Sequence, residues 1–353
     1  MVQPETIAGL IEKQSGSTAA GTLISTQLGD PTGYGRVIRD AIGNVRAIVE
    51  QKAATPEQRG VQEINAGFYC FRSDLFWKHA GEIRPDNPAH EYYLTDMVEI
   101  LIRAGHSIEP HFIADSAELL GINTRVELAA VDRIFRERTV RGLMLSGVTI
   151  ERPETVTIDA SVKIGMDTVI EPFTRILGKT VIGENCRVGA CSVISDSTLA
   201  DEVEIGAFCS IAASTLERGA HAGPYARLRM QSHVEAGAVV GNFVELKKTR
   251  LGGKSKAQHL AYLGDSTIGL GVNIGAGTIT CNYDGAKKHP TTIADGVFVG
   301  SNSTLVAPVE IGPGAYIAAG SVITEKVPED ALALGRARQA VKLGWAKKRR
   351  EKS

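Results

Sequence analysis

A branched apolar residue recurs at every sixth position in two long stretches of this sequence. The two runs are Ile158, Ile164, Ile170, Ile176, Ile182, Val188 and Ile194, and then Ile293, Val299, Leu305, Ile311, Ile317 and Ile323. No amphipathic helix repeats with a period of six residues, and a glycine often follows the branched residue, as in Ile164-Gly165. The pattern is typical of the hexapeptide repeats of a parallel β-helix, in which each hexapeptide forms one side of a triangular coil.

The composition agrees with a narrow aliphatic interior. In a triangular coil the aliphatic side chains point inward and stack on the same position one coil away, while small residues let the backbone turn at the corners. Aromatic rings fit poorly inside such a prism. The chain has 38 Gly and only 5% aromatic residues, although its hydrophobic content of 43% is ordinary. At 353 residues it is long enough for two domains.

The charge balance and the cysteines narrow the classes of partner and compartment. Lys and Arg number 39 and Asp and Glu 40, which argues against bulk binding of nucleic acid. The strongly basic segment 336–353 is either a solvated terminus or an anion-binding arm. The five cysteines are scattered, with no CxxC motif and no recognisable secretory leader, so we expect reduced thiols in a cytoplasm. No run of eighteen apolar residues predicts a membrane span.

The residues before the first hexapeptide have the mixed pattern of an α/β fold. Apolar residues recur at helical spacing in 91–104, and apolar runs bounded by turn residues indicate strands. Helices are predicted at 4–17, 91–104 and 124–145, and strands at 21–28, 45–51, 64–72 and 108–114. Asn123 is predicted to cap the last helix, which links the two parts of the chain. The Gly-rich turn 29–36 suits a close approach of the backbone to a ligand.

Polar residues gather where the six-residue repeat is interrupted, between about residues 219 and 293. A solenoid tolerates insertions on one face, and that face is commonly the binding face. Structural repeats do not require these polar residues, so the sequence predicts a functional site here. The polar runs are Arg227–Arg229, Asn242–Lys248, Lys254–Asp265, Asn273–Gly277 and Thr280–Gly285.

Five short motifs precede the hexapeptide repeats. They are Asp30–Arg36, Ile48–Glu50, Glu63–Asn65, Glu91–Asp96 and Gly121–Asn123. In order and spacing they closely resemble the sugar-nucleotidyltransferase domain of the bacterial bifunctional GlmU family. Members of that family join an N-acetylglucosamine-1-phosphate uridyltransferase to a glucosamine-1-phosphate acetyltransferase. The resemblance runs from about Pro4 to Trp345.

The resemblance implies a uridyltransferase domain of which only the second half is present. Gly35, Glu50 and Asn65 match sugar-side residues, and Asn123 matches a partner of the magnesium ion. The family's magnesium-binding Asp and its Gly-rich loop for the UTP phosphates have no counterpart in this sequence. Phosphoryl transfer depends on positioning and charge neutralisation by such groups. We therefore expect no uridyltransferase activity from this polypeptide, and magnesium only if the site is completed. The alternative is a longer native chain with both activities.

Acetyl transfer from a thioester to an amino sugar has three chemical requirements. It needs a base for the amine proton, a donor for the developing oxyanion and cations for the sugar phosphate. His259 is the natural base, because an imidazole is mostly neutral at cytoplasmic pH. Arg229, Lys247 and Lys288 can neutralise a phosphate, Arg with a bidentate grip and Lys as a point charge.

The family resemblance assigns the remaining roles residue by residue. It implies that Glu245 orients His259 and that Asn282 donates to the acetyl carbonyl oxygen. The residues implied around the sugar phosphate are Arg229, Lys247, Tyr262, Asn273 and Lys288. Those implied around acetyl-CoA are Ala276, Asn282, Tyr283, Ser301, Ala319 and Arg336.

The resemblance also implies the architecture. The expected parts are a truncated sugar-nucleotidyltransferase domain with a Rossmann-like α/β fold (1–122), a linker helix (123–148), a left-handed parallel β-helix (149–327) and a basic C-terminal arm (328–353). In the family three chains associate along the β-helix. Neither the handedness nor a homotrimer follows from the six-residue period. Distant segments such as His259 and Arg336 can serve one site across subunits of an oligomer.

The leading hypothesis is a cytoplasmic enzyme that acetylates glucosamine-1-phosphate with acetyl-CoA for the synthesis of cell-envelope precursors. No nucleic acid or membrane partner is expected. A non-catalytic β-helix scaffold is an alternative from another class, although intact His259, Asn282 and Arg336 argue against it. A zinc-dependent hydration enzyme would need three imidazoles at one metal, and the available trio is His221, His233 and His259, without a recognisable ligand spacing.

Overall fold

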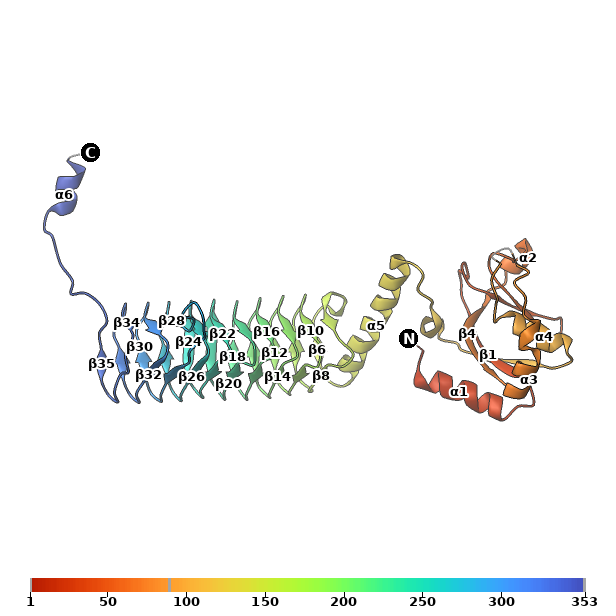
Figure 1. Ribbon diagram of the computed structural model, residues 1–353, viewed down its shortest axis with the longest axis horizontal. Coiled ribbons are helices and arrows are strands. Elements are labelled where there is room, and N and C mark those ends of the chain that lie inside the picture. Colours follow the sequence, from red (N-terminus) through yellow and green to blue (C-terminus); the bar gives the residue numbers. More distant parts are fainter. Residues whose placement is uncertain (1, 88–89, 352–353) are drawn as a thin grey trace. The chain divides into compact units, whose positions relative to one another are not determined.

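The computed structural model describes residues 2–87 and 90–351, and the chain divides into two compact units (Figure 1). The first unit is Met1–Phe135 and the second is Arg136–Ser353. The predicted linker helix is α5 (Arg125–Leu145), and the division between the units falls inside it. Among the described residues, no helix is long and apolar enough to cross a membrane.

The first unit is built on a mixed sheet of five strands in the order β3-β2-β4-β1-β5. Only β1 and β5 pair in parallel, so the sheet differs from the mostly parallel sheet of a complete Rossmann-like fold. The sequence does not predict β2, because its four residues are too few to show an alternation. The strands are β1 (Gly21–Gln27), β2 (Arg36–Arg39), β3 (Val45–Val49), β4 (Glu63–Phe71) and β5 (Ile108–Phe112).

Helices cover both faces of this sheet. Successive side chains of a strand point to opposite faces, so Leu23 and Ile24 of β1 belong to different cores. Leu23 packs in one cluster with Met97 and Leu101 of α4, and Ile24 packs in another with Leu10 of α1. The helices are α1 (Pro4–Ser15), α2 (Pro56–Arg59), α3 (Ser73–His79) and α4 (Asp96–Arg103), with the 3₁₀ turns η1 (Ala80–Glu82) and η2 (Ser116–Leu119).

The N-terminus of α5 is closed by Thr124 and Glu127. The Thr124 hydroxyl accepts a hydrogen bond from the Glu127 N–H (3.2 Å), and the Glu127 carboxylate accepts from the N–H groups of Thr124 (2.7 Å) and Asn123 (2.6 Å). This reciprocal pattern is a capping box. The prediction that Asn123 caps the helix is therefore wrong, because the Thr-x-x-Glu pair one residue later satisfies these backbone donors.

The second unit is a parallel β-solenoid with three faces (Figure 1), as the six-residue period predicts. Each strand pairs in parallel with the strands one coil before and one coil after it. We call the faces 1, 2 and 3, and the chain passes through them in this order. Face 1 consists of β7 (Thr157–Ile158), β10 (Arg175–Leu177), β13 (Val193–Ser195), β16 (Ser210–Ala212), β19 (Arg227–Arg229), β22 (Glu245–Lys247), β25 (Tyr262–Gly264), β28 (Ile279–Cys281), β31 (Thr304–Val306) and β34 (Val322–Ile323).

Faces 2 and 3 follow face 1 in each coil, and one strand of face 3 precedes the first coil. Face 2 consists of β8 (Lys163–Ile164), β11 (Val181–Ile182), β14 (Thr198–Leu199), β17 (Thr215–Leu216), β20 (His233–Val234), β23 (Arg250–Leu251), β26 (Ser266–Ile268), β29 (Thr291–Ile293) and β32 (Val309–Ile311). Face 3 consists of β6 (Thr149–Ile150), β9 (Val169–Ile170), β12 (Arg187–Val188), β15 (Glu204–Ile205), β18 (His221–Ala222), β21 (Val239–Asn242), β24 (Lys256–His259), β27 (Asn273–Ile274), β30 (Phe298–Val299), β33 (Tyr316–Ile317) and β35 (Leu332–Ala333).

The branched residues at the six-residue positions fill the interior of the solenoid. All of them except Ile164 are buried in one continuous core cluster, and Ile164 packs against it while partly exposed. On face 1, Ile176, Ile194 and Ile211 stand in register in successive coils. Fully burying such a side chain stabilises the fold by about 1.5–3 kcal/mol. The stacked interior therefore supplies the main favourable term for this unit.

The repeat continues from residue 219 to Cys281, so this part of the predicted interruption is wrong. An insertion does follow: the loop between β28 and β29 lengthens its coil, and the inward residues Thr280 and Leu305 are 25 positions apart. On face 1 the inward residues Ile194, Ile211, Leu228, Leu246 and Leu263 stand in register in successive coils. These residues are 17 or 18 positions apart, so some coils have one side of five residues instead of six. A count in sixes loses its frame at each shorter coil, which makes a continuous solenoid look interrupted.

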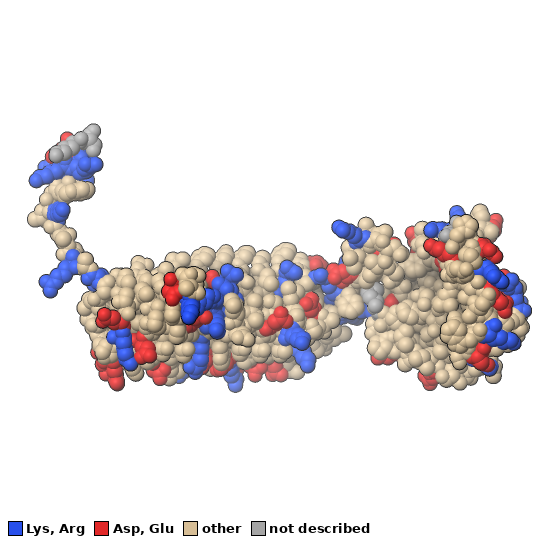
Figure 2. Space-filling model, in the orientation of Figure 1, with Lys and Arg blue, Asp and Glu red and all other residues tan. Residues whose placement is uncertain are grey.

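The solenoid extends beyond residue 327. In β35, Leu332 pairs with Tyr316 and Ala333 with Ile317 of β33, so the C-terminal arm begins after β35 and not at residue 328. The arm contains the short exposed helix α6 (Trp345–Arg350), and its Lys and Arg residues are visible in Figure 2. At the other end of the unit, Val140 of α5 is part of the core cluster. The last turns of α5 therefore belong to the solenoid.

We expect the first unit to open more readily than the solenoid. The solenoid has one continuous core, whereas the first unit has two smaller clusters and leaves Trp77 and Tyr92 75% and 72% exposed. Amides of β1–β5 should exchange at least about tenfold faster than those of solenoid strands, because local opening costs less free energy there. Hydrogen exchange followed by mass spectrometry measures this. Equal protection in the two units would show that the first unit is not the weaker one.

Candidate functional site

One group of predicted residues forms a row along a corner of the solenoid. In each of five successive coils, one residue stands just before the turn from face 3 into face 1. In chain order these residues are Asn242, His259, Ala276, Ser301 and Ala319. Each is followed by a residue with a left-handed backbone, whose N–H donates to a carbonyl of the previous coil. We call these five residues the corner row. Three of them have small side chains and follow His259 along the stacking direction, an arrangement that suits an extended ligand.

Two further predicted residues lie near the corner row. Arg336 follows Gly335, whose carbonyl accepts a hydrogen bond from the Val322 N–H (3.0 Å) in the last coil. Asn273 is in β27 on face 3, in the coil that carries Ala276. Both Arg336 and Asn273 are exposed. The structure thus brings the predicted base and most of the predicted acetyl-CoA residues to one edge.

The imidazole of His259 is oriented by Asn242. The two residues are paired in β24 and β21, and Asn242 Oδ1 lies 2.8 Å from His259 Nδ1. Because an amide oxygen can only accept, Nδ1 is the donor in this contact, and in a neutral imidazole Nε2 then carries the lone pair. Glu245, on face 1, instead accepts a hydrogen bond from Arg229 Nε (2.7 Å). In the described residues, Glu245 therefore pairs with Arg229 and not with His259, contrary to what the resemblance implies.

A second group of predicted residues lies on face 1, at its turn into face 2. Lys247 Nζ lies 2.8 Å from Asp265 Oδ2, and Asn282 Nδ2 donates to the same oxygen (2.5 Å). Lys288 lies next to Lys247. The residues that we call the charged cluster are Arg229, Glu245, Lys247, Asp265 and Lys288.

The pKa values in the charged cluster follow from these contacts. The hydrogen bond to Asp265 raises the pKa of Lys247. Burial by itself would raise the pKa of Asp265, but the hydrogen bonds from Lys247 and Asn282 bring it below its usual range. The neighbouring ammonium of Lys247 lowers the pKa of Lys288. Within the cluster, three cations and two carboxylates leave one positive charge in excess, and Arg227, whose Nη1 lies 3.7 Å from Glu245 Oε2, adds a further cation beside it. This excess suits an anionic ligand.

Gly264 makes room for the contacts of this cluster. A Cβ at this position would lie 2.5 Å from Tyr262 Oη and 2.6 Å from Asn282 Nδ2, closer than real Cβ contacts. The Tyr262 side chain therefore leans along face 1 toward the charged cluster. Tyr262 and Asn282 join Lys247 at one place, as the family resemblance implies for Tyr262 and Lys247.

The loop after β28 carries Tyr283 and Lys288. The Asp284 carboxylate closes this loop by accepting from two backbone N–H groups and from His289 Nε2 (2.6 Å). These bonds, the N–H of Lys287 first, hold the pKa of Asp284 well below its usual range. Tyr283 and Lys288 form an antiparallel bridge within the loop. The loop is thus tied by its own polar groups.

The corner row lies at one edge of face 1, and Lys247 and Asp265 of the charged cluster lie at the opposite edge, whereas Glu245 stands between them as the first residue of β22. In the coil of β25, the left-handed corners are Leu260, which follows His259, and Asp265. An extended strand rises about 3.3 Å per residue, so five steps separate these corners by roughly 16 Å. A hydrogen bond spans only about 3 Å. The width of face 1 therefore separates the backbone of His259 from that of Asp265 in the same coil.

Three of the four residues matched to a uridyltransferase site lie together in the first unit. The carbonyl of Gly35 accepts from the Asn65 N–H (2.8 Å), and a Cβ on Gly35 would lie 3.3 Å from Glu50 Oε1. The Thr95 hydroxyl donates to the same Glu50 oxygen (3.3 Å). The role of the fourth residue, Asn123, toward magnesium stays a prediction.

The three imidazoles considered for zinc do not converge in the chain. His233 is on face 2 and pairs with Glu217 (2.7 Å), whereas His221 is on face 3 and lies 3.5 Å from Glu204. His259 is already bonded to its neighbour in the corner row. Within residues 2–87 and 90–351, no group of three His, Cys, Asp or Glu side chains is arranged to hold a metal ion. Within one chain, this trio therefore does not form the zinc site that the alternative hypothesis needs.

Sequence reasoning missed Asn242 and Asp265 as contact residues. Each stands one coil away from its partner: Asn242 is 17 positions before His259, and Lys247 is 18 positions before Asp265. A coil length of 17 or 18 residues would have paired them. The period of six does not show which coils have a five-residue side. The spacing of one coil was therefore present in the sequence, but it did not identify these two pairs unambiguously.

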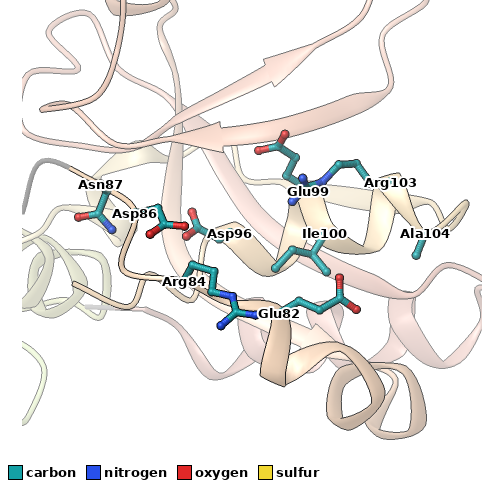
Figure 3. Close-up of a pocket in the computed structure, with 9 residues that line it drawn as sticks. All are labelled: Glu82, Arg84, Asp86, Asn87, Asp96, Glu99, Ile100, Arg103 and Ala104. Atoms are coloured by element: carbon teal, nitrogen blue, oxygen red, sulfur yellow. The ribbon is translucent and has the colours of Figure 1, made fainter. Parts of the chain in front are cut away.

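A pocket of about 700 Å³ in the first unit involves none of the predicted site residues (Figure 3). Its carboxylates and Arg side chains come from the segment 82–87 and from α4. Burial, and then the nearby charge of Glu99, raise the pKa of Asp96. The pocket is lined by Glu82, Arg84, Asp86, Asn87, Asp96, Glu99, Ile100, Arg103 and Ala104.

Known proteins resemble this chain along almost its whole length. A family model described as bacterial transferase hexapeptide (six repeats) matches residues 161–196 and 290–325. The bifunctional protein GlmU of Solibacter usitatus is 65% identical over 351 residues, which cover 99% of this chain and 75% of that protein. The bifunctional protein GlmU of Koribacter versatilis is 50% identical over 353 residues, covering 99% of this chain and 75% of that protein.

The solved structures are more distant. The UDP-N-acetylglucosamine acyltransferase of Francisella novicida is 16% identical, aligns with 57% of this chain and 73% of its own, and gives a TM-score of 0.34, which is too low to support an argument. The identity and the coverage of the two relatives are decisive by themselves. This chain belongs to the bifunctional GlmU family.

Proposed function

We propose that this chain transfers the acetyl group of acetyl-CoA to the amino group of glucosamine-1-phosphate, giving N-acetylglucosamine-1-phosphate. Membership of the bifunctional GlmU family supports this proposal. The observation that carries it is the presence of an oriented imidazole at His259 and of a cationic cluster around Lys247, each held by contacts of its own.

In the proposed reaction the amine nitrogen attacks the thioester carbonyl carbon, so a C–N bond forms and the C–S bond breaks. His259 Nε2 accepts the proton that the amine loses and passes it to the departing thiolate of CoA. The hydrogen bond from Nδ1 to Asn242 keeps Nε2 available for this proton. Asn282 is the candidate donor to the carbonyl oxygen, where negative charge develops in the transition state.

The charged cluster is the proposed site for the sugar phosphate. Arg229 suits a bidentate grip on phosphate, and Lys247 and Lys288 act as point charges. The hydroxyl of Tyr262 points into the same place. Asn273, also implied for the sugar phosphate, lies on face 3. It can reach the sugar only if another copy of the chain supplies the charged cluster.

The corner row is the proposed site for the extended arm of acetyl-CoA. Ala276, Ser301 and Ala319 follow His259 coil by coil, so an extended chain laid along them keeps its thioester end at His259. Arg336, at the end of the same edge, is then placed for the phosphates of CoA. Tyr283 and Asn282 lie at the other edge of face 1 and would come from a second copy.

We propose that the active site is shared between copies of the chain in a homotrimer. Backbone corners at the two edges of face 1 are roughly 16 Å apart, so within one chain Asn282 does not stand beside a carbonyl group bound at His259, and another copy would have to supply this donor. Exposed apolar residues on the turn after the corner row support an interface. Phe208, Tyr225 and Phe243 are 51%, 46% and 55% exposed, and their rings stack with centroids 5.0 and 5.1 Å apart. Such an apolar ridge commonly marks an interaction surface. The left-handed sense of the coil remains a prediction from the family.

We expect the polypeptide of residues 1–353 to have no uridyltransferase activity by itself. Gly35, Glu50 and Asn65 lie close together, which supports the sugar-side role that the family resemblance implies for them. No step of the proposed reaction passes through magnesium. A longer native chain with both activities remains the alternative.

Replacing His259 by Ala should lower kcat for acetyl transfer by roughly 10²–10⁴-fold, because the general base is removed. Thiol release from acetyl-CoA with glucosamine-1-phosphate measures this, and UTP turnover assayed in parallel should be absent. His233→Ala is the matched control, since it removes an imidazole from face 2 and should leave kcat unchanged. Equal rates for His259→Ala and the unaltered chain would exclude the proposed role. No transfer by the unaltered chain would favour the scaffold alternative.

Mixing two inactive variants tests whether the site is shared. Chains with His259→Ala and chains with Asn282→Ala, produced together, should regain about a quarter of the unaltered activity, because some sites then combine an intact His259 with an intact Asn282. Each variant alone should be inactive. If both residues act within one chain, the mixture stays inactive. Sedimentation measurements on the same samples report whether the chains form trimers.

The affinity for phosphate should fall in alkaline solution at a lower pH than is usual for a lysine site. The neighbouring Lys247 lowers the pKa of Lys288. Lys288 is charged below its pKa and loses its proton as the pH rises through that value. This loss occurs at a lower pH than for an ordinary lysine, whose pKa is near 10.4. Calorimetric titration with inorganic phosphate at a series of alkaline pH values measures this. In Lys288→Gln the affinity should be lower at neutral pH and the alkaline decrease should vanish. A decrease of the same size in the variant would exclude Lys288 as its origin.

A further inference from the structure

Gly264 and Asp265 gather three groups of the proposed site from three successive coils. Asp265 Oδ2 accepts hydrogen bonds from Lys247 Nζ (2.8 Å), one coil before, and from Asn282 Nδ2 (2.5 Å), one coil after. The side chains of Lys247 and Asp265 are only 5% and 13% exposed. Gly264 leaves open the space in which Tyr262 Oη and Asn282 Nδ2 meet.

We propose that Gly264 and Asp265 are positioning residues for acetyl transfer. Asp265 orients the amide of Asn282, and it also holds Lys247 and offsets the positive charge of that lysine. Gly264 leaves open the space that the side chains of Tyr262 and Asn282 occupy. The kinetic part of this inference rests on the proposed function. Its electrostatic part concerns anion binding and does not depend on catalysis.

The orientation of Asn282 follows from the chemistry of its amide. The amide nitrogen has two hydrogens, and donating one of them to Asp265 fixes the plane of the group. Because Asn282 is only 6% exposed, few water molecules compete for this bond. The second N–H and the carbonyl oxygen then point in fixed directions. Without the acceptor, the amide can turn its oxygen toward the reacting carbonyl, and an oxygen there repels a developing oxyanion.

Asp265 also determines how much positive charge a phosphate meets. It pairs with Lys247, so the charged cluster keeps one positive charge in excess. Asn at this position keeps the size of the side chain, and it tolerates the left-handed backbone of Asp265 (φ 49°). The substitution Asp265→Asn therefore raises the excess to two charges with little change of shape.

Asp265→Asn should separate catalysis from anion binding. We expect kcat to fall by about 10- to 100-fold, because the donor to the carbonyl oxygen is no longer held in place. The affinity for inorganic phosphate, measured by calorimetry, should rise about threefold or more from one added unit charge about 6 Å away. The KM for glucosamine-1-phosphate should not increase. A residue with a merely structural role would weaken binding and catalysis together.

Gly264→Ala tests the same site without changing its charge. The backbone of Gly264 does not have a positive φ, so Ala is compatible with the strand, but its Cβ displaces Tyr262 and Asn282. We expect kcat to fall about tenfold or more while the affinity for phosphate does not rise. Glu310→Gln is the matched control, because it removes a carboxylate from the exposed ion pair with Lys326 (2.8 Å) on face 2. It should change neither quantity.

The outcomes distinguish this inference from the proposed function. If the unaltered chain transfers no acetyl group, the proposed function fails, and the phosphate affinity of Asp265→Asn still tests the electrostatic part. Normal kcat and normal phosphate affinity in both variants would overturn the inference. Thermal melting identifies a variant that does not fold. If Asp265→Asn does not fold, an unchanged kcat in Gly264→Ala is sufficient to overturn the positioning role.

Discussion

Hydrogen bonding between successive coils is the constraint on which the structure of the second unit depends. Its strands have two to four residues, too few to be stable alone, and each is held by parallel pairing with the coils before and after it. The pairing stacks side chains from equivalent positions. Inside, this gives the aliphatic core, and outside it brings polar residues into contact at intervals of one coil. Asn242 with His259 and Lys247 with Asp265 are both contacts of this kind.

The corners of the coils carry the functional consequences of this repetition. A left-handed backbone is uncommon for residues other than glycine, yet Phe208, Tyr225 and Phe243 all adopt it, with φ of 60°, 56° and 57°. The coils on either side impose this geometry on each corner, and the side chains then project into solvent as one apolar ridge. The corner row next to this ridge places His259 beside small residues. The surface that we propose for other copies of the chain and the site that we propose for an extended cofactor therefore lie along the same edge.

The two groups of candidate residues occupy opposite edges of one face, and the width of that face follows from strand geometry alone. Each group is locally complete. His259 has its orienting partner, and Lys247 has its counter-ion. Neither group has the chemistry of the other, so a reaction that needs a base and a phosphate site draws on more than one edge. In the proposed reaction, the association of copies would therefore be part of the chemistry and not only of stability.

The sequence by itself determined the solenoid, because a branched residue at every sixth position has no other common structural explanation. It also indicated the polar runs that contain the candidate site. It did not determine the partners within the site. Coils of 17 and of 18 residues both fit the pattern, so the sequence left open that Asn242 orients His259 and that Asp265 holds Asn282. Only the tertiary structure decided these contacts, because they depend on which residues of neighbouring coils are in register.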